Sequence, residues 1–420
     1  MMQSRSTKLY KTLQKRYSRR INLDLKRIKK ALQKLNLPHL NLNQPINFIG
    51  SDGKMSTLTS LKFFLEAHNK KVTAFTSPHL YDLRQRFWLK DRYISLLDIK
   101  KFQRVIENTK SKLTLFELLT CIYILAAKKE TKIDYNLIEA GLLFNKDSTN
   151  LWRSPRAQVI TNINLQHQDW INPKTINEIC KQKLSSLSQN TTIYVAKQNP
   201  KVLKIIKKIL NKNESKKIYS NEWKIQKNKS SYTYKDERVT LPIKSNNIHS
   251  IGLINNLGLS IKIALDFGVP KKTIIKTIPK IFFEGRIQYL KKGKFKRLIK
   301  SNERLLVDGC HSTESAKNLY NYLKTLNEPI YGIWGMQKNK SPENFIKIFK
   351  KIFKKVITIR IPNEPNSCTS NELAMISKKY FESKEALSIK NALTKVSDGK
   401  PKTIVVFGSL YLIGNLLSLN

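Results

Sequence analysis

Residues 46–57 read Ile-Asn-Phe-Ile-Gly-Ser-Asp-Gly-Lys-Met-Ser-Thr. The order of residue types in this stretch predicts a strand, a glycine-containing loop and a helix. The apolar run at 46–49 predicts a strand, and a helical pattern begins at Lys54. Between them, Gly50 and Gly53 let the backbone turn tightly and point N–H groups at an anion, while Lys54 and Ser56 can serve phosphate and metal. The stretch therefore predicts a phosphate-binding loop. Its spacing is shorter than in the common G-x-x-x-x-G-K-[ST] loop, and a plain strand-to-helix turn is the alternative.

A second predicted strand follows about one helix later. Residues 72–75 read Val-Thr-Ala-Phe, and the polar turn Thr76-Ser77-Pro78-His79-Leu80 comes directly after them. With these segments the chain resembles folylpolyglutamate synthase and dihydrofolate synthase of the Mur ligase superfamily. In that family the phosphate loop reads G-T-N-G-K-G-S-T and the second strand ends in T-S-P-H-L.

Further segments resemble the family's motifs and occur in the family's order. They are residues 21–27 for I-D-L-x-L-x-R, 114–117 for T-F-F-E, 139–150 for E-V-G-L-G-G-R-L-D-A-T-N, 165–172 for L-D-H-x-D-W-L-G, Lys183 for the lysine of E-K-A-G-I, 284–286 for P-G-R, 308–312 for D-G-A-H-N, and 408–414 for G-S-L-Y-L-x-G. The resemblance covers nearly the whole chain. It rests on the occurrence of all these motifs in the family's order and not on any single motif.

The chain is strongly basic, with 78 Lys plus Arg against 30 Asp plus Glu and a formal charge of +48. Such a charge would ordinarily suggest nucleic-acid binding. The basic residues are spread through every segment among abundant Asn and Ile, so we interpret them as solvent-facing and expect no specific nucleic-acid partner. The positive field would still attract ATP, folate and glutamate, which are all anions.

The cysteine pattern and the two ends of the chain bear on location. Cys121, Cys180, Cys310 and Cys368 show neither C-x-x-C pairing nor zinc-ligand spacing, which fits a reducing cytoplasm. The basic N-terminus could pass for an organellar presequence, but the motif at 21–27 argues against that reading. The apolar tail 403–419 is interrupted by Gly and Asn, which predicts a buried strand, a glycine turn and a short helix rather than a membrane anchor. We expect a cytoplasmic monomer without membrane attachment.

A chain of 420 residues is too long for one compact core. Apolar runs at 46–49, 72–75, 137–140, 159–163 and 192–195 alternate with helical patterns and predict a parallel sheet with crossover helices. Residues 215–250 are polar and predict a smaller antiparallel excursion, and a helix is expected over 251–267. Runs at 305–307, 330–333, 356–359 and 404–407 predict a second α/β unit. We expect an α/β protein with a P-loop-containing Mur ligase domain over 1–288 that binds ATP, and a smaller Rossmann-like glutamate-ligase domain over 289–420.

The resemblance implies an ATP-dependent ligase that joins L-glutamate to 7,8-dihydropteroate and to tetrahydrofolate or its polyglutamates. A carboxylate is a poor electrophile, so the family phosphorylates it first, and the amine of glutamate then displaces phosphate through a tetrahedral intermediate. Both steps need fixed positive groups. The residues expected to hold ATP are Gly53, Lys54, Met55, Ser56, Asn256, Arg286, Asp308 and His311. Because these lie on both sides of the predicted hinge, catalysis should require domain closure.

Two Mg²⁺ sites are expected. Ser56, Ser77 and Glu139 supply the oxygen ligands that Mg²⁺ prefers, and by resemblance His167 serves the second ion. In relatives the lysine that matches Lys183 carries CO₂ as a carbamate, so the resemblance gives Lys54, His167 and Lys183 as catalytic residues. Taken alone, His167 would be a hydrogen-bonded structural histidine, Ser77 a turn residue, Lys183 a solvated helix lysine and Asp308-Gly309 a turn dipeptide.

The pterin acid is assigned by resemblance to three clusters and a C-terminal motif. These residues are Ile21, Asn22, Leu23, Thr114, Leu115, Phe116, Glu117, Lys146, Asp147, Ser148, Ser409, Leu410 and Tyr411. Phe116 and Tyr411 could alternatively be core aromatics. The N-terminal match is of the type found in bacterial two-activity enzymes, which favours dihydropteroate as well as folates.

Several positions depart from the family's pattern. Met55 replaces a loop glycine and would crowd the nucleotide unless its φ is negative, and Asp52 replaces Asn. Residues 143–145, Leu-Phe-Asn, replace Gly-Gly-Arg. Two further hypotheses therefore stay open: a degenerate relative that binds nucleotide or folate without turnover, and a basic nucleic-acid-binding protein.

Overall fold

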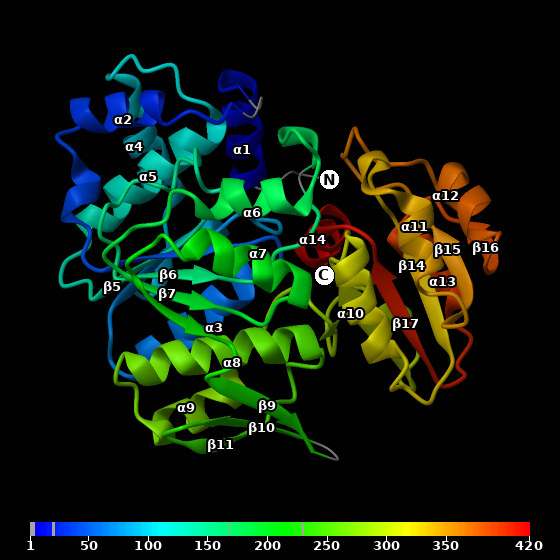
Figure 1. The fold of residues 1–420 in the computed structure, drawn as a ribbon. Helices are drawn as coiled ribbons and strands as arrows, with labels where there is room; N and C mark the ends of the chain where they lie inside the picture. The colour runs from blue at the N-terminus through cyan, green and yellow to red at the C-terminus, as the bar shows by residue number, and fades with distance from the viewer. Residues whose placement is uncertain (1–4, 19–21, 167, 229–230) are drawn as a thin grey trace. The chain divides into compact units, whose positions relative to one another are not determined.

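The computed structural model describes residues 5–18, 22–166, 168–228 and 231–420 (Figure 1). It divides into two compact units, Met1–Ser245 with Leu253–Ile281, and Asn246–Gly252 with Phe282–Asn420. The units change over at Ile281 and Phe282, before the boundary expected at residue 288. The second unit also includes residues 246–252, which end within the first turn of α8, and no sequence pattern reveals this.

The first unit is built on an eight-stranded sheet with the order β4-β3-β2-β5-β1-β6-β7-β8. Its strands are β1 (Pro45–Ile49), β2 (Val72–Phe75), β3 (Phe87–Leu89), β4 (Arg92–Tyr93), β5 (Tyr135–Glu139), β6 (Ala157–Ile160), β7 (Thr192–Val195) and β8 (Lys216–Tyr219). All residues of β1, β2, β5 and β6 are buried, as expected for central strands of a parallel sheet covered on both faces. The predicted parallel sheet with crossover helices is confirmed.

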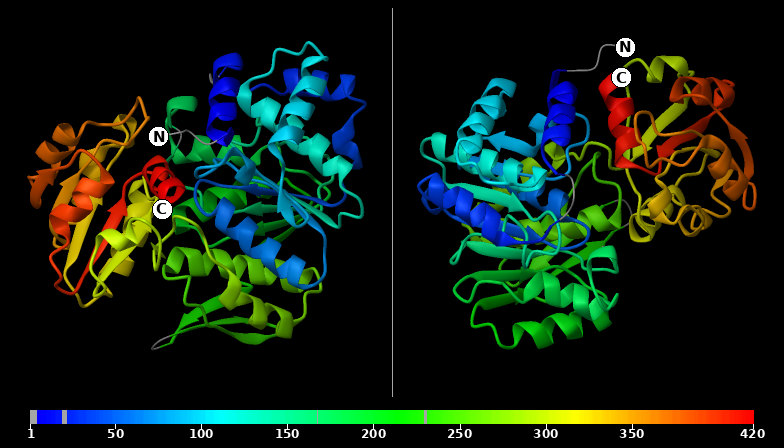
Figure 2. Two further views of the ribbon diagram at one scale, coloured as in Figure 1. Left: turned by 180° about the vertical axis from the view of Figure 1, so that it is seen from behind. Right: turned by 90° about the horizontal axis from the view of Figure 1, so that it is seen from above.

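Helices lie on both faces of this sheet. They are α1 (Arg5–Arg16), α2 (Leu25–Lys34), α3 (Lys54–Ala67), α4 (Leu96–Glu107), α5 (Leu115–Lys129), α6 (Ile176–Leu184), α7 (Pro200–Leu210), α8 (Ile251–Asp266) and α9 (Lys271–Thr277). Helix α5 packs on β2 and β3, whereas α3 packs on β1 and β5, and Figure 1 shows them on opposite sides of the strands. The view from behind in Figure 2 shows α3 lying across the strands.

The expectation for residues 215–250 is partly wrong. Strands β9 (Trp223–Lys227), β10 (Tyr232–Asp236) and β11 (Thr240–Ile243) do form a small antiparallel sheet. However, β8 pairs with β7 in parallel and extends the main sheet at its edge. The pattern of β8, Lys-Lys-Ile-Tyr, is that of a half-exposed edge strand and does not resemble the buried runs beside it.

The second unit has a six-stranded sheet with the order β12-β13-β17-β14-β15-β16. Its strands are β12 (Gln288–Tyr289), β13 (Glu303–Asp308), β14 (Ile330–Trp334), β15 (Phe353–Thr358), β16 (Glu382–Glu385) and β17 (Lys402–Phe407), and its helices are α10 (Thr313–Leu323), α11 (Pro342–Lys347), α12 (Ser370–Ser377), α13 (Ile389–Val396) and α14 (Leu410–Leu419). The four predicted strands are confirmed. The C-terminal tail forms β17, a turn at Gly408 and α14, as predicted. In the described part of the chain, no helix combines the length and apolarity needed to cross a membrane.

Candidate functional site

The candidate site lies at the carboxyl edge of the main sheet. Strands β2, β5, β1 and β6 are neighbours and run in parallel, so the loops that follow them emerge at the same edge. Glu139 is the last residue of β5, and the phosphate loop follows β1 directly. This topology brings together residues that the sequence separates by tens of positions.

The predicted phosphate loop has the geometry of an anion cradle. Gly53 precedes α3 with φ 90°, and the helix has no side-chain cap among the described residues, which leaves its first N–H groups for another acceptor. Lys54 Nζ folds back to donate to the carbonyls of Gly50 (3.2 Å) and Ser51 (3.4 Å). Asn256 Nδ2 donates to Ser56 Oγ at 2.8 Å, so the structure brings this predicted residue to the loop.

The two departures inside the loop are accommodated. Met55 lies within α3, outside the left-handed region, and its sulfur accepts a hydrogen bond from Thr59 Oγ1 at 3.6 Å, one turn further along. The side chain therefore needs no strained backbone. Asp52 Oδ2 accepts from Asn164 Nδ2 (2.6 Å) and Gln166 Nε2 (3.0 Å), so hydrogen bonds from two amides stabilise its charge.

Two of the predicted metal ligands are in contact. Glu139 is 3% exposed, and its Oε2 accepts a hydrogen bond from the backbone N–H of Ser77 at 3.0 Å. Ser56 lies in the first turn of α3, directly after the phosphate loop, and is also buried. A carboxylate and two hydroxyls are hard oxygen donors, so this set fits Mg²⁺ completed by water and phosphate oxygens.

Lys183 is buried beneath the phosphate loop. It lies in α6, is 2% exposed, and its Nζ donates to the carbonyl of Gly50 at 3.0 Å. Burial, followed by repulsion from the Lys54 ammonium, lowers the pKa of Lys183 to about 7. The solvated helix position that its neighbours suggested is therefore wrong, and burial favours the neutral form of the amine.

A cavity of about 350 Å³ adjoins these residues. Its lining includes the predicted acceptor residues Asn22, Leu23, Thr114, Leu115, Phe116, Glu117, Lys146, Asp147 and Ser148. Ser77 and Gly141 also line it. The structure thus gathers nine residues from three separate segments around one space.

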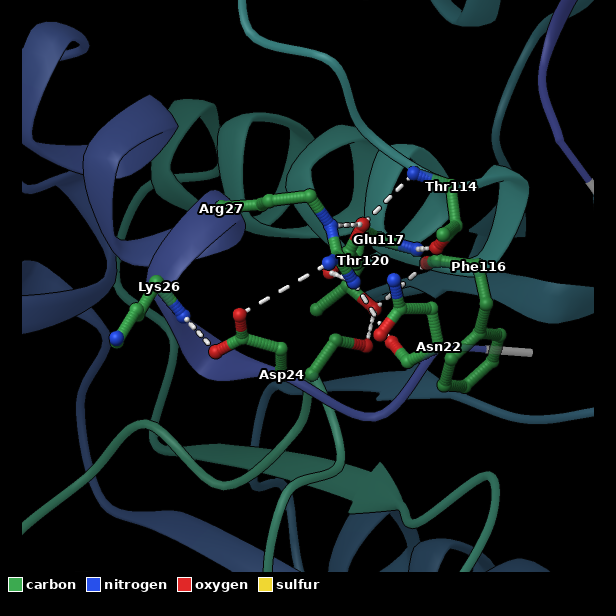
Figure 3. Close-up of polar contacts among 9 residues, drawn as sticks. Asn22, Asp24, Lys26, Arg27, Thr114, Phe116, Glu117 and Thr120 are labelled. Atoms are coloured by element: carbon green, nitrogen blue, oxygen red, sulfur yellow. Dashed lines mark hydrogen bonds and ion pairs between the residues drawn. The ribbon is translucent and has the colours of Figure 1, made fainter. Parts of the chain in front are cut away.

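A polar network holds the wall of this cavity (Figure 3). Glu117 and Thr114 form a capping box at the start of α5, and Glu117 also accepts from Arg27 Nη2 at 2.9 Å. The same guanidinium donates to the carbonyl of Asn22 at 2.6 Å, which ties the N-terminal segment to α5. The Glu117 carboxylate is therefore hydrogen-bonded within the protein, and it connects Arg27 to the start of α5.

Phe116 and Asp147 shape the interior. A Cβ atom on Gly141 would lie 2.5 Å from the Phe116 ring, so only glycine lets the ring pack there. The ring lines the cavity, although it also packs near Phe75 at 5.8 Å, so the core reading of Phe116 is partly right. Asp147 is buried, which raises the pKa of its carboxyl against the opposing hydrogen bonds from Thr149 and Leu142.

Several lining residues of this cavity were not among the predicted site residues, and three of them bring a polar group to it. Tyr10 and Gln14 of α1 and the buried Arg86 line it. Arg86 Nε donates to His79 Nδ1 at 2.8 Å, and burial lowers the pKa of His79 to about 3, so the imidazole is a neutral acceptor. His79 belongs to the T-S-P-H-L motif, which was the available signal for this pair.

Leu143 is the most unusual of the departures. It has φ 50° at the position where the family has a glycine, yet its side chain is 2% exposed. Leu143 and Phe144 both pack into the core beneath α6 and α7. Leucine at this position therefore loses the ease with which glycine adopts a positive φ, but it gains the burial of an apolar side chain.

The remaining predicted nucleotide residues lie in the second unit. Asp308 is 5% exposed, its Oδ2 accepts from the N–H of Ile287 at 2.8 Å, and burial raises the pKa of its carboxyl while Arg286 opposes the rise. His311 Nδ1 lies 3.0 Å from the carbonyl oxygen of Gly309. Hydrogen bonds within the turn thus hold both the Asp308 carboxylate and the His311 ring.

The C-terminal motif is also in the second unit. Ser409 caps α14 and is buried, whereas Tyr411 is 53% exposed and so is not a core aromatic. A Cβ on Gly309 would lie 2.5 Å from Leu410 Cδ2, which shows that Leu410 packs on the Asp308 turn.

Two predicted site residues, Ile21 and His167, lie outside the described residues. Their roles therefore stay predictions.

Comparisons with known proteins match the chain along its length. Residues 291–419 match the family described as dihydrofolate synthetase, C-terminal domain. The chain is 24% identical to the dihydrofolate synthase/folylpolyglutamate synthase of Haemophilus influenzae, covering 96% of this chain and 94% of the relative. It is also 24% identical to the dihydrofolate synthetase of Saccharomyces cerevisiae, covering 95% and 98%.

Solved structures give the same picture for the fold. Folylpolyglutamate synthase of Mycobacterium tuberculosis complexed with ADP is similar with a TM-score of 0.86 at 18% identity, covering 98% of this chain and 97% of that one. Escherichia coli FolC in complex with DHPP and ADP is similar with a TM-score of 0.84 at 20% identity, covering 100% and 98%. The predicted Mur ligase fold is confirmed. Over nearly their full length, both the sequence and the fold of this chain are therefore similar to those of dihydrofolate synthase/folylpolyglutamate synthases.

Proposed function

We propose that the protein is an ATP-dependent ligase that joins L-glutamate to 7,8-dihydropteroate, and to tetrahydrofolate or its polyglutamates, through an acyl phosphate. The observation that carries this proposal is the position of Ser77. Ser77 lines the 350 Å³ cavity that holds the predicted acceptor residues, which we call the acceptor cavity. Its backbone N–H also donates a hydrogen bond to Glu139, at the edge of the sheet where the phosphate loop lies. An acid in the cavity would therefore lie next to the phosphoryl group it must receive.

The first step is phosphoryl transfer. The acid's carboxylate oxygen would attack the γ-phosphorus of ATP and ADP would leave, with Lys54 turning from its carbonyl partners towards the β- and γ-phosphates. When bound, Mg²⁺ would neutralise charge on the transferred group, and Ser56, Ser77, Glu139 and His167 are the proposed ligands of the two ions. Asn256, which donates a hydrogen bond to Ser56, would help to position the nucleotide.

The second step is amide formation. The amine of glutamate would attack the acyl carbon, and phosphate would leave from the tetrahedral intermediate. In the second unit, Arg286, Asp308 and His311 are the residues proposed to contact the nucleotide, and Ser409 to Tyr411 are those proposed to contact the acceptor. The resemblance to relatives and the complex of FolC with DHPP and ADP support both ligand classes.

Lys183 would act after reaction with CO₂. The neutral amine attacks the carbon of CO₂ and loses one proton, which yields an anionic carbamate. A pKa of about 7 favours this reaction because the neutral, nucleophilic form is well populated at neutral pH. The carbamate would then be a carboxylate-like group directly beneath Gly50.

The test is a purified-protein assay of ADP formation with each component omitted in turn. The proposal expects ADP only when ATP, Mg²⁺, glutamate and dihydropteroate or a reduced folate are all present. Nucleotide or folate binding without ADP formation would instead support the degenerate relative, and salt-sensitive DNA retention without turnover would support the basic nucleic-acid binder.

We further infer a cytoplasmic monomer with a linker that follows the end of the first unit at Ile281 and includes the proposed domain boundary at residue 288. Sedimentation of the purified protein as a single-chain species and preferred proteolysis within 289–301 would agree with this inference. A stable dimer would contradict it.

A further inference from the structure

A second cavity, of about 1290 Å³, opens elsewhere in the first unit. Pro45 at the start of β1 and Arg156 just before β6 line it, so it lies towards the amino ends of the strands. The phosphate loop and Glu139 lie at the carboxyl ends. No described residue lines both this cavity and the acceptor cavity. This second cavity is therefore separate from the candidate site at the carboxyl edge of the main sheet.

The charge around this cavity has one sign. Lys29, Arg153 and Arg156 line it, and none of its described lining residues is acidic. Lys29 and Arg153 make no ion pair with any described residue, and both are exposed. A concave site with unpaired cations and no carboxylates attracts anions and would not hold a metal cation.

A buried imidazole faces the same space without a partner. His39 is 8% exposed, and its Nδ1 has no hydrogen-bond partner among the described residues. Burial, followed by the nearby Lys29, lowers the pKa of His39. Unsatisfied buried ring nitrogens are uncommon in native proteins. Because Nδ1 itself is buried, a ligand in the cavity would become its partner only if the imidazole turned towards the cavity.

Apolar side chains complete the wall. Trp152 donates its indole N–H to the carbonyl of His39 at 2.8 Å, and the two rings meet edge to face with centroids 6.4 Å apart. Leu37 and Leu40 border the cavity and are 40% and 63% exposed. Pockets for small molecules combine such apolar walls with a few convergent polar groups.

The wall is held by hydrogen bonds. Asn150 Nδ2 donates to the carbonyl of Asn145 (3.2 Å) and to Ser186 Oγ (3.0 Å). The N–H of Asn145 in turn donates to the carbonyl of Gln182 at 3.0 Å. These bonds connect the loop after β5 to α6, so the cavity is preformed.

We propose that this cavity is a second ligand site that takes a small aromatic anion, with its carboxylate or phosphate between Lys29 and Arg153 and its ring against Trp152 and the leucines. Two sources share this chemistry, a nucleoside monophosphate and an aminobenzoyl-glutamate fragment of a folate. The site does not depend on the ligase reaction proposed above.

The test follows tryptophan fluorescence in two titrations, one with adenosine monophosphate and one with p-aminobenzoyl-glutamate, at up to millimolar concentrations. We expect a saturable change with at least one probe that is lost in Trp152→Phe, and the probe that binds identifies the source. The double variant Lys29→Glu/Arg153→Glu should bind at least about tenfold more weakly. The matched control Lys30→Glu/Lys174→Glu makes the same change of charge at exposed lysines outside the cavity and should bind as the wild type does.

Two results would overturn the proposal. One is the absence of any Trp152-dependent change with either probe. The other is equal weakening in both double variants, which would mean that the overall positive field and not the cavity attracts the anion. Unchanged thermal unfolding of each variant shows that the comparison is made on folded protein.

Discussion

Replacing Lys183 with methionine should stabilise the protein while abolishing its activity. The pKa of this amine falls from 10.5 to about 7 on folding, and each pKa unit corresponds to about 1.4 kcal/mol. Burying the amine therefore costs about 5 kcal/mol below pH 7 and about 4 kcal/mol at pH 7. Methionine has a similar length and no charge. It loses the hydrogen bond to Gly50, worth about 1 kcal/mol, so the net gain is about 3 kcal/mol.

The sign of the pH dependence follows from proton binding. Between pH 7 and 10.5 the unfolded chain keeps the Lys183 proton and the folded protein does not, so wild-type stability rises with pH across this window. The methionine variant lacks this contribution. Its advantage over wild type should therefore be largest at pH 7 or below and should disappear near pH 10.5.

The assay is thermal unfolding in CO₂-depleted buffer, followed by ADP release under ligase conditions. We expect the midpoint to rise by about 5 °C at pH 7 and the turnover to fall at least about a hundredfold. Lys181→Met, at an exposed position of the same helix, is the control and should change neither value. A midpoint that stays the same or falls would refute the buried, neutral lysine.

Three further substitutions test the rest of the site. Arg27→Met leaves the Glu117 carboxylate buried without its cation and should cost about 3 kcal/mol in urea unfolding. Leu143→Gly relieves a left-handed backbone by about 1 kcal/mol but removes a buried leucine worth about 2–5 kcal/mol, so burial wins and urea unfolding should show a net loss. Glu139→Gln keeps the bond from Ser77 but removes the charge, so kcat/KM should fall at least about a hundredfold and the Mg²⁺ requirement should rise, with little change in Tm.

Each of these has an outcome that contradicts it. A neutral Arg27→Met would mean that the ion pair in the wall contributes nothing measurable, and Lys26→Met is its exposed control. A stabilised Leu143→Gly would mean that backbone strain outweighs the buried side chain. Full activity of Glu139→Gln would remove the carboxylate from the proposed metal site.

Local features of the fold could be predicted from the sequence. The phosphate loop was predictable because the apolar run 46–49, the two glycines and the helix that follows are contiguous. The charged edge strands β8 and β16 were not, because their side chains face solvent and carry no apolar pattern. A strand of this kind is defined by its pairing partner and not by its own composition.

The site was predictable only where motifs carried it. Burial of Lys183 depends on a carbonyl 133 positions away, and no local pattern reveals such a contact. Tyr10 and Gln14 line the acceptor cavity because α1 packs beside it, whereas its other lining residues are distant in the sequence. Helical periodicity predicts a helix but does not say which cavity it covers.

The central claim, activation of the acid as an acyl phosphate, is tested most directly by following an oxygen atom. Dihydropteroate labelled with ¹⁸O in its carboxylate is incubated with ATP, Mg²⁺ and glutamate, and the released phosphate is analysed by mass spectrometry. The account predicts one ¹⁸O atom in each phosphate formed. Unlabelled phosphate alongside glutamylated product would contradict it.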